Sequence, residues 1–557
     1  MLHRLPFTLL LALTLALPAT AQEQSRRNFE TSKQLDVFNS LYRDLDLYYV
    51  DTLDAKKNIE NAILYMLDQL DPYTVYYDES NTGELKQLTT GKYAGIGAVI
   101  LPRADLGRCI ISMPYEGMPA AEAGLRRGDI ILSIDGKDTG ELGSQAPGDY
   151  SSAVSSQLRG QPGTTFDIVV RRPGVEGELT FAVTRRTIVQ PSITCSALIT
   201  DSIGYILLNG FTENTGRDVR LAFEDLKARG AKSLILDLRS NPGGLMSEAV
   251  KLVNLFIPRG REVISTRGKV KESTAVYKTQ SEPLDLEMPI VVLTNYGTAS
   301  AAEITSGALQ DYDRAVIVGQ RTYGKGLVQE TRQLPYNGLL KLTTSRYYIP
   351  SGRCIQAYKF EDGEPVHIPD SLAHEFRTAA GRIVRDGGGI TPDVIVQSDS
   401  LPNLLLYLHM SDQLFDYCVE YRNAHPTVAS PEEFKLTDAE YAELRAYLKA
   451  HNFTYDRQSL RLLNELRKVA AREGYAEEAK EEFAALEAKL THNEDFDFTY
   501  WEDEIRKLVE QIIVENYYYD RGGAIYNFRY DPDIATGLSI LRDSKRYREL
   551  LAPPTGK

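Results

Sequence analysis

Residues 289–330, PIVVLTNYGTASAAEITSGALQDYDRAVIVGQRTYGKGLVQE, contain the turn from which the rest of the chain can be interpreted. The apolar run from Ile290 to Leu293 is typical of a buried strand, residues 295–298 have turn composition, and Ser300 to Leu309 has helix composition. We therefore expect Ser300 where a strand passes into a helix. There its hydroxyl would be exposed beside the next N–H group and the positive end of a helix dipole, which together stabilise an oxyanion.

A lysine follows in the same stretch, in Tyr323-Gly324-Lys325-Gly326. Glycines on both sides let the backbone approach its neighbours closely and leave the amine as the functional group. A serine and a lysine that meet in a dry site can act as nucleophile and base, because desolvation lowers the pKa of a lysine amine toward neutrality. Each feature alone also fits a plain helix N-cap or a plain turn.

Length, charge and the N-terminus limit the class of protein. The chain has 557 residues, enough for three or four domains at roughly 150 residues each, and its formal net charge of −14 gives no reason to expect nucleic-acid binding. Residues 1–21 combine a short basic start, an apolar core and Ala19-Thr20-Ala21, the pattern of a cleaved signal peptide. We expect a periplasmic or otherwise secreted protein without a stable transmembrane anchor after cleavage; an uncleaved anchor is the alternative.

The cysteines predict neither a metal site nor a particular disulfide. No Cys/His spacing typical of zinc occurs, so we expect no metal and no cofactor. Export permits a disulfide, but the pattern does not say which pair would form it. The cysteines are Cys109, Cys195, Cys354 and Cys418.

Residues 22–88 have the apolar spacing of amphipathic helices, and Asp71-Pro72 ends the second of them. The apolar stripes are more typical of packing faces than of a site. A helical cap or a dimerisation arm is a reasonable use for this N-terminal region.

Residues 89–187 resemble a PDZ domain. The resemblance depends jointly on the loop Gly95-Ile96-Gly97, which runs into a strand, and on AGLRRGDIILSIDG at residues 123–136. In PDZ domains the N–H groups of this loop bind a C-terminal carboxylate while the peptide adds as a strand. The resemblance therefore assigns Gly95, Ile96 and Gly97 to substrate binding; a glycine turn that only connects two strands is the alternative.

Residues 188–400 alternate between strand and helix composition, which predicts an α/β core with a layered sheet. Asp237-Leu238-Arg239-Ser240-Asn241-Pro242-Gly243-Gly244 falls where a buried strand meets a helix. Glycines free backbone N–H groups to point outward, as an oxyanion site requires. A simple glycine-rich turn is the competing interpretation.

Five segments in one order resemble the carboxyl-terminal processing proteases, also called tail-specific proteases. With LDPYT at residues 70–74 and the PDZ segment, the resemblance covers about residues 30–400; Thr74 stands where serine is more usual. It implies a multidomain α+β protein with a helical N-terminal region, a PDZ domain, an α/β (ClpP/crotonase-like) protease core and a helical C-terminal domain. The segments are LILDLRSNPGG (234–244), TASAAEITSGALQDYDRAVIVG (298–319), TYGKGLVQ (322–329), LTTSRYYIPSGRCIQ (342–356) and GGGITPDVIV (387–396).

By this resemblance, Ser300 is the nucleophile, Lys325 the general base and Gln329 the residue that orients the lysine. The histidine distribution is compatible with a lysine base. No histidine occurs between residues 22 and 366, so a Ser-His-Asp triad would have to recruit His367 or His374 from a polar segment after the core.

The oxyanion donors expected are the Ala301 N–H and a backbone N–H from Gly243 or Gly244. Arg159, in the segment LRGQPG, aligns with an arginine that in related proteases couples the PDZ domain to the active site. It could equally be a solvated turn residue.

The resemblance implies an exported serine endopeptidase that cleaves proteins at or from their C-terminal ends and recognises apolar tails through its PDZ domain. The alternative is a catalytically inactive, PDZ-containing peptide-binding scaffold of the cell envelope. Residues 401–557 are charged and helical in pattern, and their role is not assigned. An adaptor or a second copy of the chain is left open as their partner.

Overall fold

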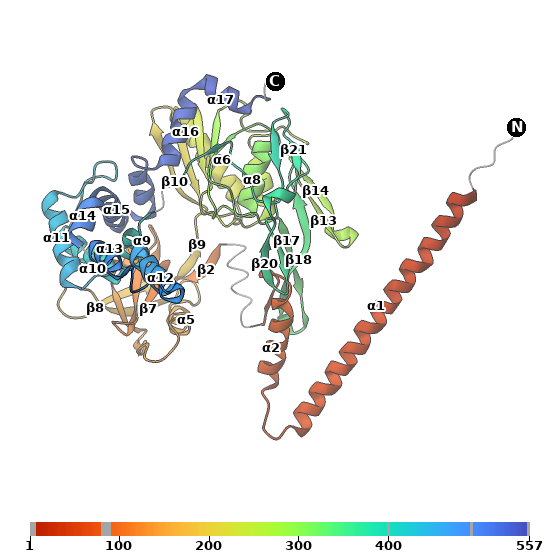
Figure 1. Cartoon of the computed structure of the whole chain (residues 1–557), viewed down its shortest axis with the longest axis horizontal. Helices are drawn as coiled ribbons and strands as arrows, with labels where there is room; N and C mark the ends of the chain where they lie inside the picture. Colours follow the sequence, from red (N-terminus) through yellow and green to blue (C-terminus); the bar gives the residue numbers. More distant parts are fainter. Residues whose placement is uncertain (1–6, 80–90, 398–400, 491–493, 554–557) are drawn as a thin grey trace. The chain divides into compact units, whose positions relative to one another are not determined.

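The structure is a computed structural model that describes residues 7–79, 91–397, 401–490 and 494–553 (Figure 1). The chain divides into two compact units, of which the first holds residues 1–76 and 360–364. The first unit contains α1 (Phe7–Tyr48) and α2 (Ala55–Asp68), and Asp54 caps α2 by accepting the Lys57 N–H. Of the expected helical region 22–88, residues 80–88 lie outside the described residues. Among the helices described, none has the length and apolarity needed to cross a membrane.

The PDZ region forms its own sheet around one hydrophobic core. The strands lie in the order β3-β4-β5-β7-β8, β6 pairs with β5, and β2 pairs separately with β9. Gly124 ends α4 in the left-handed conformation that favours glycine. The elements are β2 (Lys92–Gly95), β3 (Ala98–Arg103), β4 (Arg108–Pro114), α4 (Pro119–Ala123), β5 (Ile130–Ile134), β6 (Lys137–Asp138), α5 (Pro147–Leu158), β7 (Thr165–Arg171), β8 (Leu179–Thr184) and β9 (Arg186–Val189).

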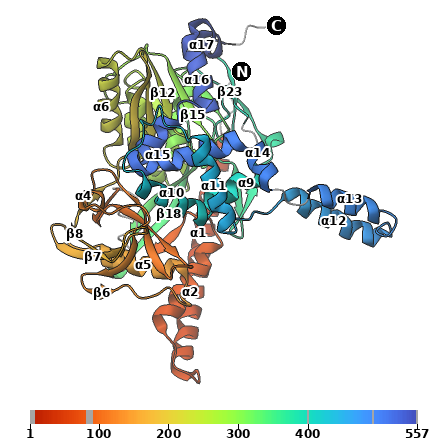
Figure 2. The same cartoon turned by 90° about the vertical axis from the view of Figure 1, so that its left-hand side faces the viewer.

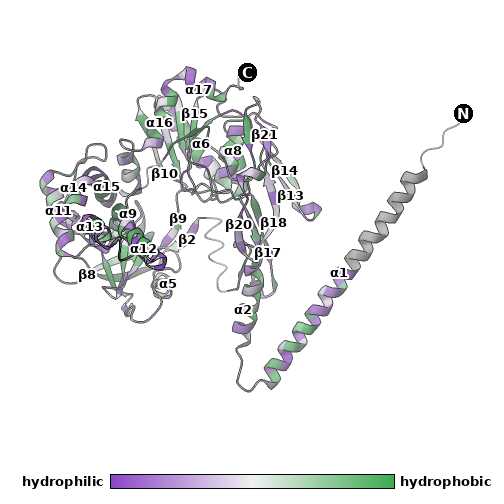
Figure 3. Ribbon diagram, viewed as in Figure 1, coloured by the Kyte–Doolittle hydropathy of each residue, from purple (hydrophilic) through white to green (hydrophobic). Residues whose placement is uncertain are grey.

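The predicted α/β core is built on a sheet with the strand order β10-β11-β12-β15-β16-β23. The pairs from β11 to β23 are parallel, and β10 is antiparallel to β11. Figure 3 shows the hydrophobic colouring of the strands around β15. The elements are β10 (Ile193–Thr200), β11 (Ile203–Leu208), α6 (Thr215–Ala228), β12 (Ser233–Asp237), α7 (Met246–Asn254), β15 (Ile290–Thr294), α8 (Ala301–Asp311), β16 (Val316–Gly319) and β23 (Val394–Ile395).

Both faces of this sheet are covered, which explains why its strands are almost continuously apolar. Alternate residues of one strand point to opposite faces. Leu234 and Leu236 of β12 belong to the core formed with α6, α7 and α8, whereas Ile235 packs with α16 (Pro532–Arg542) and α17 (Ser544–Leu551). Figure 1 and Figure 2 both show α16 beside the sheet. The end of the C-terminal region is thus part of the protease core.

A second group of paired strands carries the residues after the lysine loop. Its strands pair in the order β17-β18-β13-β14, and shorter hairpins pair β19 with β20 and β21 with β22. The elements are β13 (Glu262–Gly268), β14 (Ala275–Lys278), β17 (Leu327–Gln333), β18 (Leu339–Tyr348), β19 (Tyr358–Glu361), β20 (Glu364–His367), β21 (Glu375–Arg377) and β22 (Ile383–Arg385).

Helices α9, α10, α11, α14 and α15 share a separate hydrophobic core, whereas α12 and α13 form an extended hairpin that contributes no residue to it (Figure 2). Helix α10 contacts the PDZ region: Arg103 of β3 binds Asp416 at 2.9 Å and Asp412 at 3.2 Å, and Asn423 donates to the Pro173 carbonyl. The helices are α9 (Asn403–Met410), α10 (Asp412–Ala424), α11 (Asp438–Ala450), α12 (Gln458–Glu473), α13 (Lys480–Leu490), α14 (Glu494–Tyr500) and α15 (Glu502–Asn527).

Candidate active site

Ser300 lies between β15 and α8, at the strand-to-helix turn expected from the sequence. Its φ of 55° is unusual for a residue other than glycine and costs about 1–3 kcal/mol, so the surroundings must hold it. The Asn295 side-chain oxygen accepts the Ser240 N–H at 2.8 Å, and the Thr298 hydroxyl donates to the Leu238 carbonyl at 2.8 Å. These bonds join the serine turn to the turn that follows β12.

Gly243 lies directly against the turn that carries Ser300. A Cβ atom at this position would come within 2.7 Å of the Ser300 Cβ and the Ala299 carbonyl oxygen, and within 2.8 Å of the Ala301 nitrogen. The backbone also has a φ of +94°, which favours glycine. A glycine is therefore required for this close approach, and the structure brings the predicted residues Gly243, Ser300 and Ala301 together.

The expected oxyanion donors differ in their hydrogen bonding. The Gly243 N–H donates to the side-chain oxygen of Asn241 at 2.9 Å. The N–H groups of Gly244 and Ala301 donate to no acceptor within the part of the chain that the structure describes. In this arrangement Gly244 and Ala301 offer available N–H groups, and Gly243 could donate to an oxyanion only after Asn241 moves.

A buried carboxylate, Glu303, connects the serine turn to the lysine loop. One of its oxygens accepts the Ser300 N–H at 2.8 Å and the Lys325 N–H at 2.9 Å. The other accepts the Thr322 hydroxyl at 2.5 Å and the Gly324 N–H at 2.7 Å. Burial raises the pKa of Glu303, while its hydrogen-bond donors favour the charged form.

Sequence reasoning missed Glu303, although a signal for it was present. Ser300 and Glu303 have the spacing of a capping box, in which the carboxylate three residues into a helix accepts the N–H of the N-cap residue. The structure contains that bond, but the same carboxylate also binds the lysine loop. The pattern predicts the first contact and gives no information on the second.

The glycines beside Lys325 allow the close approach predicted for them. A Cβ atom at Gly324 would lie 2.4 Å from the Ala357 Cβ, and one at Gly326 would lie 2.9 Å from the Gln356 nitrogen. The Gly326 N–H donates to the Gln356 side-chain oxygen at 2.6 Å. The lysine loop is therefore packed directly onto the segment that follows β18.

Gln329 lies on β17, four residues after Lys325. Its side-chain nitrogen donates to the Thr343 hydroxyl of β18 at 3.1 Å. This bond fixes the amide across the strand pair. The role of Gln329 in orienting Lys325 stays a prediction.

Two features of the PDZ region bear on its expected role. The Ile96 and Gly97 N–H groups donate to no acceptor among the described residues, while their carbonyls accept from Ala120 and Tyr115. Arg159 follows α5 and lies over the Tyr93 ring, 5.6 Å from its centroid.

Arg159 also lies near the glycines expected to be oxyanion donors. A cavity of about 490 Å³ is lined by Arg159 together with Gly91, Phe211, Gly243 and Gly244. The structure thus places one predicted PDZ residue and two predicted oxyanion residues around the same cavity.

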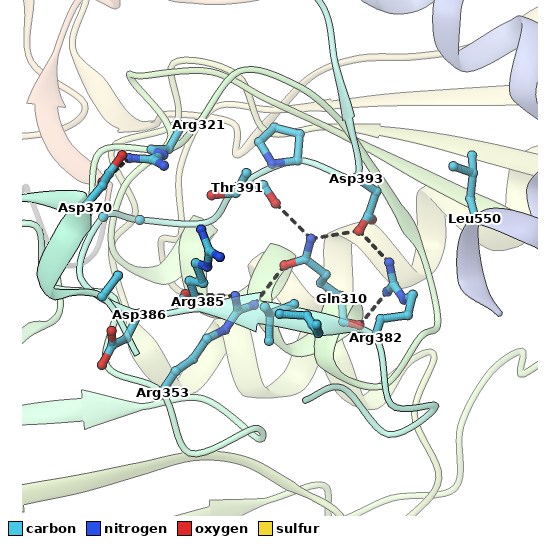
Figure 4. A pocket seen from close by; sticks show the side chains of 16 residues that line it. Gln310, Arg321, Arg353, Asp370, Arg382, Arg385, Asp386, Thr391, Asp393 and Leu550 are labelled. Atoms are coloured by element: carbon cyan, nitrogen blue, oxygen red, sulfur yellow. Dashed lines mark hydrogen bonds and ion pairs between the residues drawn. The ribbon is translucent and has the colours of Figure 1, made fainter. Parts of the chain in front are cut away.

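A second cavity, of about 450 Å³, contains none of the predicted site residues (Figure 4). It is bordered by an ion-pair network in which Gln310 of α8 donates to Asp393, and Asp393 binds Arg382. Arg353 donates to the Gln310 side-chain oxygen at 2.8 Å. This network holds the C-terminal half of the helix whose first turn carries Ser300.

The residues that the structure describes contain no group of three or more His, Cys, Asp or Glu side chains placed to hold a metal ion. The four cysteines are free thiols. Burial raises the pKa of Cys109 to about 11.

Family models match three parts of the chain. Residues 202–365 match peptidase family S41, residues 110–172 match the PDZ domain, and residues 404–541 match the C-terminal helical domain of PDZ-proteases. The predicted family and the predicted combination of domains are confirmed.

Curated relatives agree with the family models. A carboxy-terminal-processing protease of Bartonella bacilliformis is 34% identical over 390 residues, covering 69% of this chain and 80% of that protein. The carboxy-terminal processing protease CtpA of Bacillus subtilis is 31% identical over 361 residues, covering 64% and 75%. Among solved structures, the photosystem II D1 C-terminal processing protease is 27% identical, covering 65% of this chain and 87% of that chain with a TM-score of 0.35.

The chain therefore belongs to the carboxy-terminal processing proteases of peptidase family S41. It is a serine-type endopeptidase.

Proposed function

We propose that the chain is an exported peptidase in which Ser300 is the nucleophile and Lys325 the general base, and whose PDZ domain selects apolar C-terminal tails. The observation that carries the proposal is the shared hydrogen-bond acceptor: one oxygen of Glu303 accepts the N–H groups of both residues. The two loops thereby keep a fixed backbone spacing.

In the acylation step, the Ser300 hydroxyl oxygen attacks the carbonyl carbon of the scissile peptide bond and its proton passes to a neutral Lys325 amine. The negative charge that develops on the carbonyl oxygen is stabilised by the Ala301 N–H and an N–H of the Gly243–Gly244 turn. The C–N bond then breaks, and the leaving amine takes the proton from the lysine.

In the deacylation step, water attacks the ester formed on Ser300 while Lys325 again accepts a proton. The bond between the acyl carbon and the Ser300 oxygen breaks, Lys325 returns its proton to that oxygen, and the new C-terminal acid leaves. Gln329 holds the lysine in line. Because its amide nitrogen donates to Thr343, its carbonyl oxygen is the atom that would accept from the lysine amine.

Tail recognition is supported by the N–H groups of Ile96 and Gly97, which suit a terminal carboxylate. Arg159 lies over the Tyr93 ring and lines the same cavity as Gly243 and Gly244, which supports a role for it in coupling tail binding to cleavage. Export is supported by the signal-like composition of residues 1–21.

The test of the dyad uses purified protein and an unfolded substrate with an apolar C-terminal tail. We expect Ser300→Ala and Lys325→Ala to abolish cleavage while the exposed-residue controls, Ser247→Ala and Lys359→Ala, cleave at the native rate. Circular dichroism checks that each variant is folded. Cleavage that persists in a folded Ser300→Ala or Lys325→Ala protein would reject the dyad.

The test of tail recognition compares the same substrate with a free and an amidated C-terminus. We expect amidation to raise KM, since the loop N–H groups would lose a charged acceptor, and Arg159→Ala to remove activation by added tail peptide. Equal KM values for the two substrates would reject carboxylate recognition. N-terminal sequencing of the protein recovered from the cell envelope tests cleavage after Ala21.

A further inference from the structure

Arg239 connects the turn at Gly243 to the C-terminal helix α16. Its Nε and Nη2 atoms bind the Asp237 carboxylate, with Nη2 at 2.6 Å, and its Nη1 atom binds Asp531 at 2.7 Å and Asp533 at 3.0 Å. One edge of the guanidinium therefore faces the end of β12, and the remaining nitrogen faces the first turn of α16.

These ion pairs are shielded from water. The side chains are 19% exposed for Arg239, 16% for Asp531, 14% for Asp533 and 1% for Asp237. The carboxylates around Arg239 raise its pKa, so the guanidinium stays charged and its bonds to them are charge-assisted. The position of Arg239 is consequently set from two directions.

Helix α16 is itself held firmly in place, so it can fix the position of Arg239. Asp531 caps the helix by accepting the Asp533 and Ile534 N–H groups at 2.9 and 3.0 Å. Further along, a Cβ atom at Gly537 would lie 3.3 Å from both Ile235 and Val291 of the sheet, so the helix lies close against the strands. The Tyr547 hydroxyl of α17 accepts the Ile290 N–H at 3.0 Å.

The chain from Arg239 to the oxyanion region is short and already constrained. Ser240 has a φ of 55°, and its N–H is held by Asn295. Asn241 donates to the Leu208 carbonyl at 2.6 Å, and Gly243 touches the serine turn. Because these contacts restrict the backbone of residues 240–243, a shift of Arg239 would displace Gly243 and Gly244 relative to Ser300.

We propose that Asp531 and Asp533 are positioning residues for peptide hydrolysis: they hold Arg239, and through it the 240–244 turn, in the geometry that stabilises the oxyanion. The proposal rests on the role proposed above for this turn in acyl transfer. It gives the final helices of the C-terminal region a part in catalysis without contact with the substrate.

The test is the double variant Asp531→Asn with Asp533→Asn. Asparagine caps a helix about as well as aspartate, so the change removes the charges while keeping the cap. Asp543→Asn is the matched control, because Asp543 caps α17 in the same way through the Lys545 and Arg546 N–H groups and has no described bond to Arg239. The readouts are kcat and KM for a tailed substrate and the Ki of a peptide aldehyde, whose adduct with Ser300 places an oxyanion in the site.

In the double variant we expect kcat to fall roughly tenfold. Complete removal of one oxyanion donor lowers kcat by about 10²–10³, and this variant should displace the donor only in part. We expect KM to stay within twofold and Ki to rise by the factor that kcat loses. The Asp543→Asn control keeps native kcat and Ki. If the double variant does not fold, Asp533→Asn alone is judged by the same criteria, since Asp531 then still caps the helix.

Native kcat and Ki in the folded double variant would overturn the proposal. A fall in kcat with unchanged Ki would also overturn it, because that result indicates a smaller active fraction rather than a displaced oxyanion site. The role of the turn itself is tested separately by Gly243→Ala. If Gly243→Ala is inactive while the aspartate variants are native, the positioning role alone is rejected; if Gly243→Ala is fully active, the proposed role of the turn fails.

Discussion

The backbone N–H groups of Ser300 and Lys325 donate to the same oxygen of Glu303, at 2.8 and 2.9 Å. Glu303 is fully buried in the first turn of α8, where the helix dipole favours a negative charge. The carboxylate thus holds the proposed nucleophile and the proposed base from one position.

Replacing this carboxylate should separate the two loops. In Glu303→Gln, an amide NH₂ group would face N–H donors in place of an acceptor oxygen, so at least one contact becomes repulsive. We expect kcat to fall by about 10² or more, the scale of losing one preorganised group in an active site. Steady-state hydrolysis of a tailed peptide measures this loss.

The matched control is Glu248→Gln. Glu248 is also buried in the first turn of a core helix, where it accepts the Gly216 N–H at 3.0 Å and binds Lys251. It has no described contact with the site, so its variant should lose stability but keep kcat. Equal losses of kcat in the two variants would show that Glu303 acts only through folding.

The pH dependence follows from the same group. Burial raises the pKa of Glu303 above 4.5, its ordinary value, and protonation removes acceptor capacity. Activity should therefore fall as the pH drops through this raised pKa, at a higher pH than an exposed glutamate would set.

The pH dependence of folding stability has the opposite sign from that of activity. The folded state binds the proton more tightly than the unfolded state, so between pH 4.5 and the raised pKa this residue adds unfolding free energy as the pH falls. Tm measured against pH for the native protein and Glu303→Gln isolates that contribution. A native Tm that falls more steeply than the variant's on acidification in this window would contradict the assigned shift.

The contact between Gly243 and Ser300 predicts that adding one methyl group at Gly243 lowers activity more than it lowers stability. Gly243→Ala should inactivate the enzyme, because its Cβ would collide with the Ser300 Cβ and the Ala299 carbonyl. Gly260→Ala is the control: its φ of +83° imposes a similar backbone cost, but no atom lies within 4 Å of the added Cβ. Comparable unfolding free energies with activity lost only in Gly243→Ala would support the contact. Native activity in Gly243→Ala would contradict it.

Local patterns predicted the elements that carry the site. The apolar run at 290–293 and the helix composition after Ser300 correspond to β15 and α8, since burial on both sheet faces and helix propensity act within a short window. Family motifs indicated Gly243 and Lys325. Local patterns could not show that Glu303 spans two loops, because that contact depends on tertiary packing across a separation of more than twenty residues.

In the C-terminal region, too, the sequence pattern predicted local structure but not tertiary contacts. Its charged periodicity predicted helices correctly, as for α11 at Asp438–Ala450. The pattern did not show that α16 would cover one face of the protease sheet. An amphipathic helix carries an apolar face without specifying its partner, and Asp531 and Asp533 are ordinary N-terminal residues of a helix until Arg239 is placed beside them.

The ion pair between Asp129 and Arg172 should be the main polar support of the PDZ core. Both residues are buried, and two charge-assisted bonds of 2.7 and 2.8 Å join them, while Asp129 also accepts the Arg126 N–H. Arg172→Ala would leave a buried carboxylate without its counter-charge, which costs about 3–5 kcal/mol. Hydrogen exchange of β5 and β7 amides measures the loss within this region.

Arg171→Ala is the control for that measurement, since Arg171 is the exposed neighbour on β7. We expect its exchange rates to match the native protein, and Arg172→Ala to speed exchange throughout the PDZ sheet while leaving amides of β15 in the protease core protected. Unchanged exchange in β5 and β7 of Arg172→Ala would mean that water or another group compensates Asp129. Loss of protection in both sheets would instead show that the two regions unfold as one cooperative unit, because only then does a local defect lower the stability of the core.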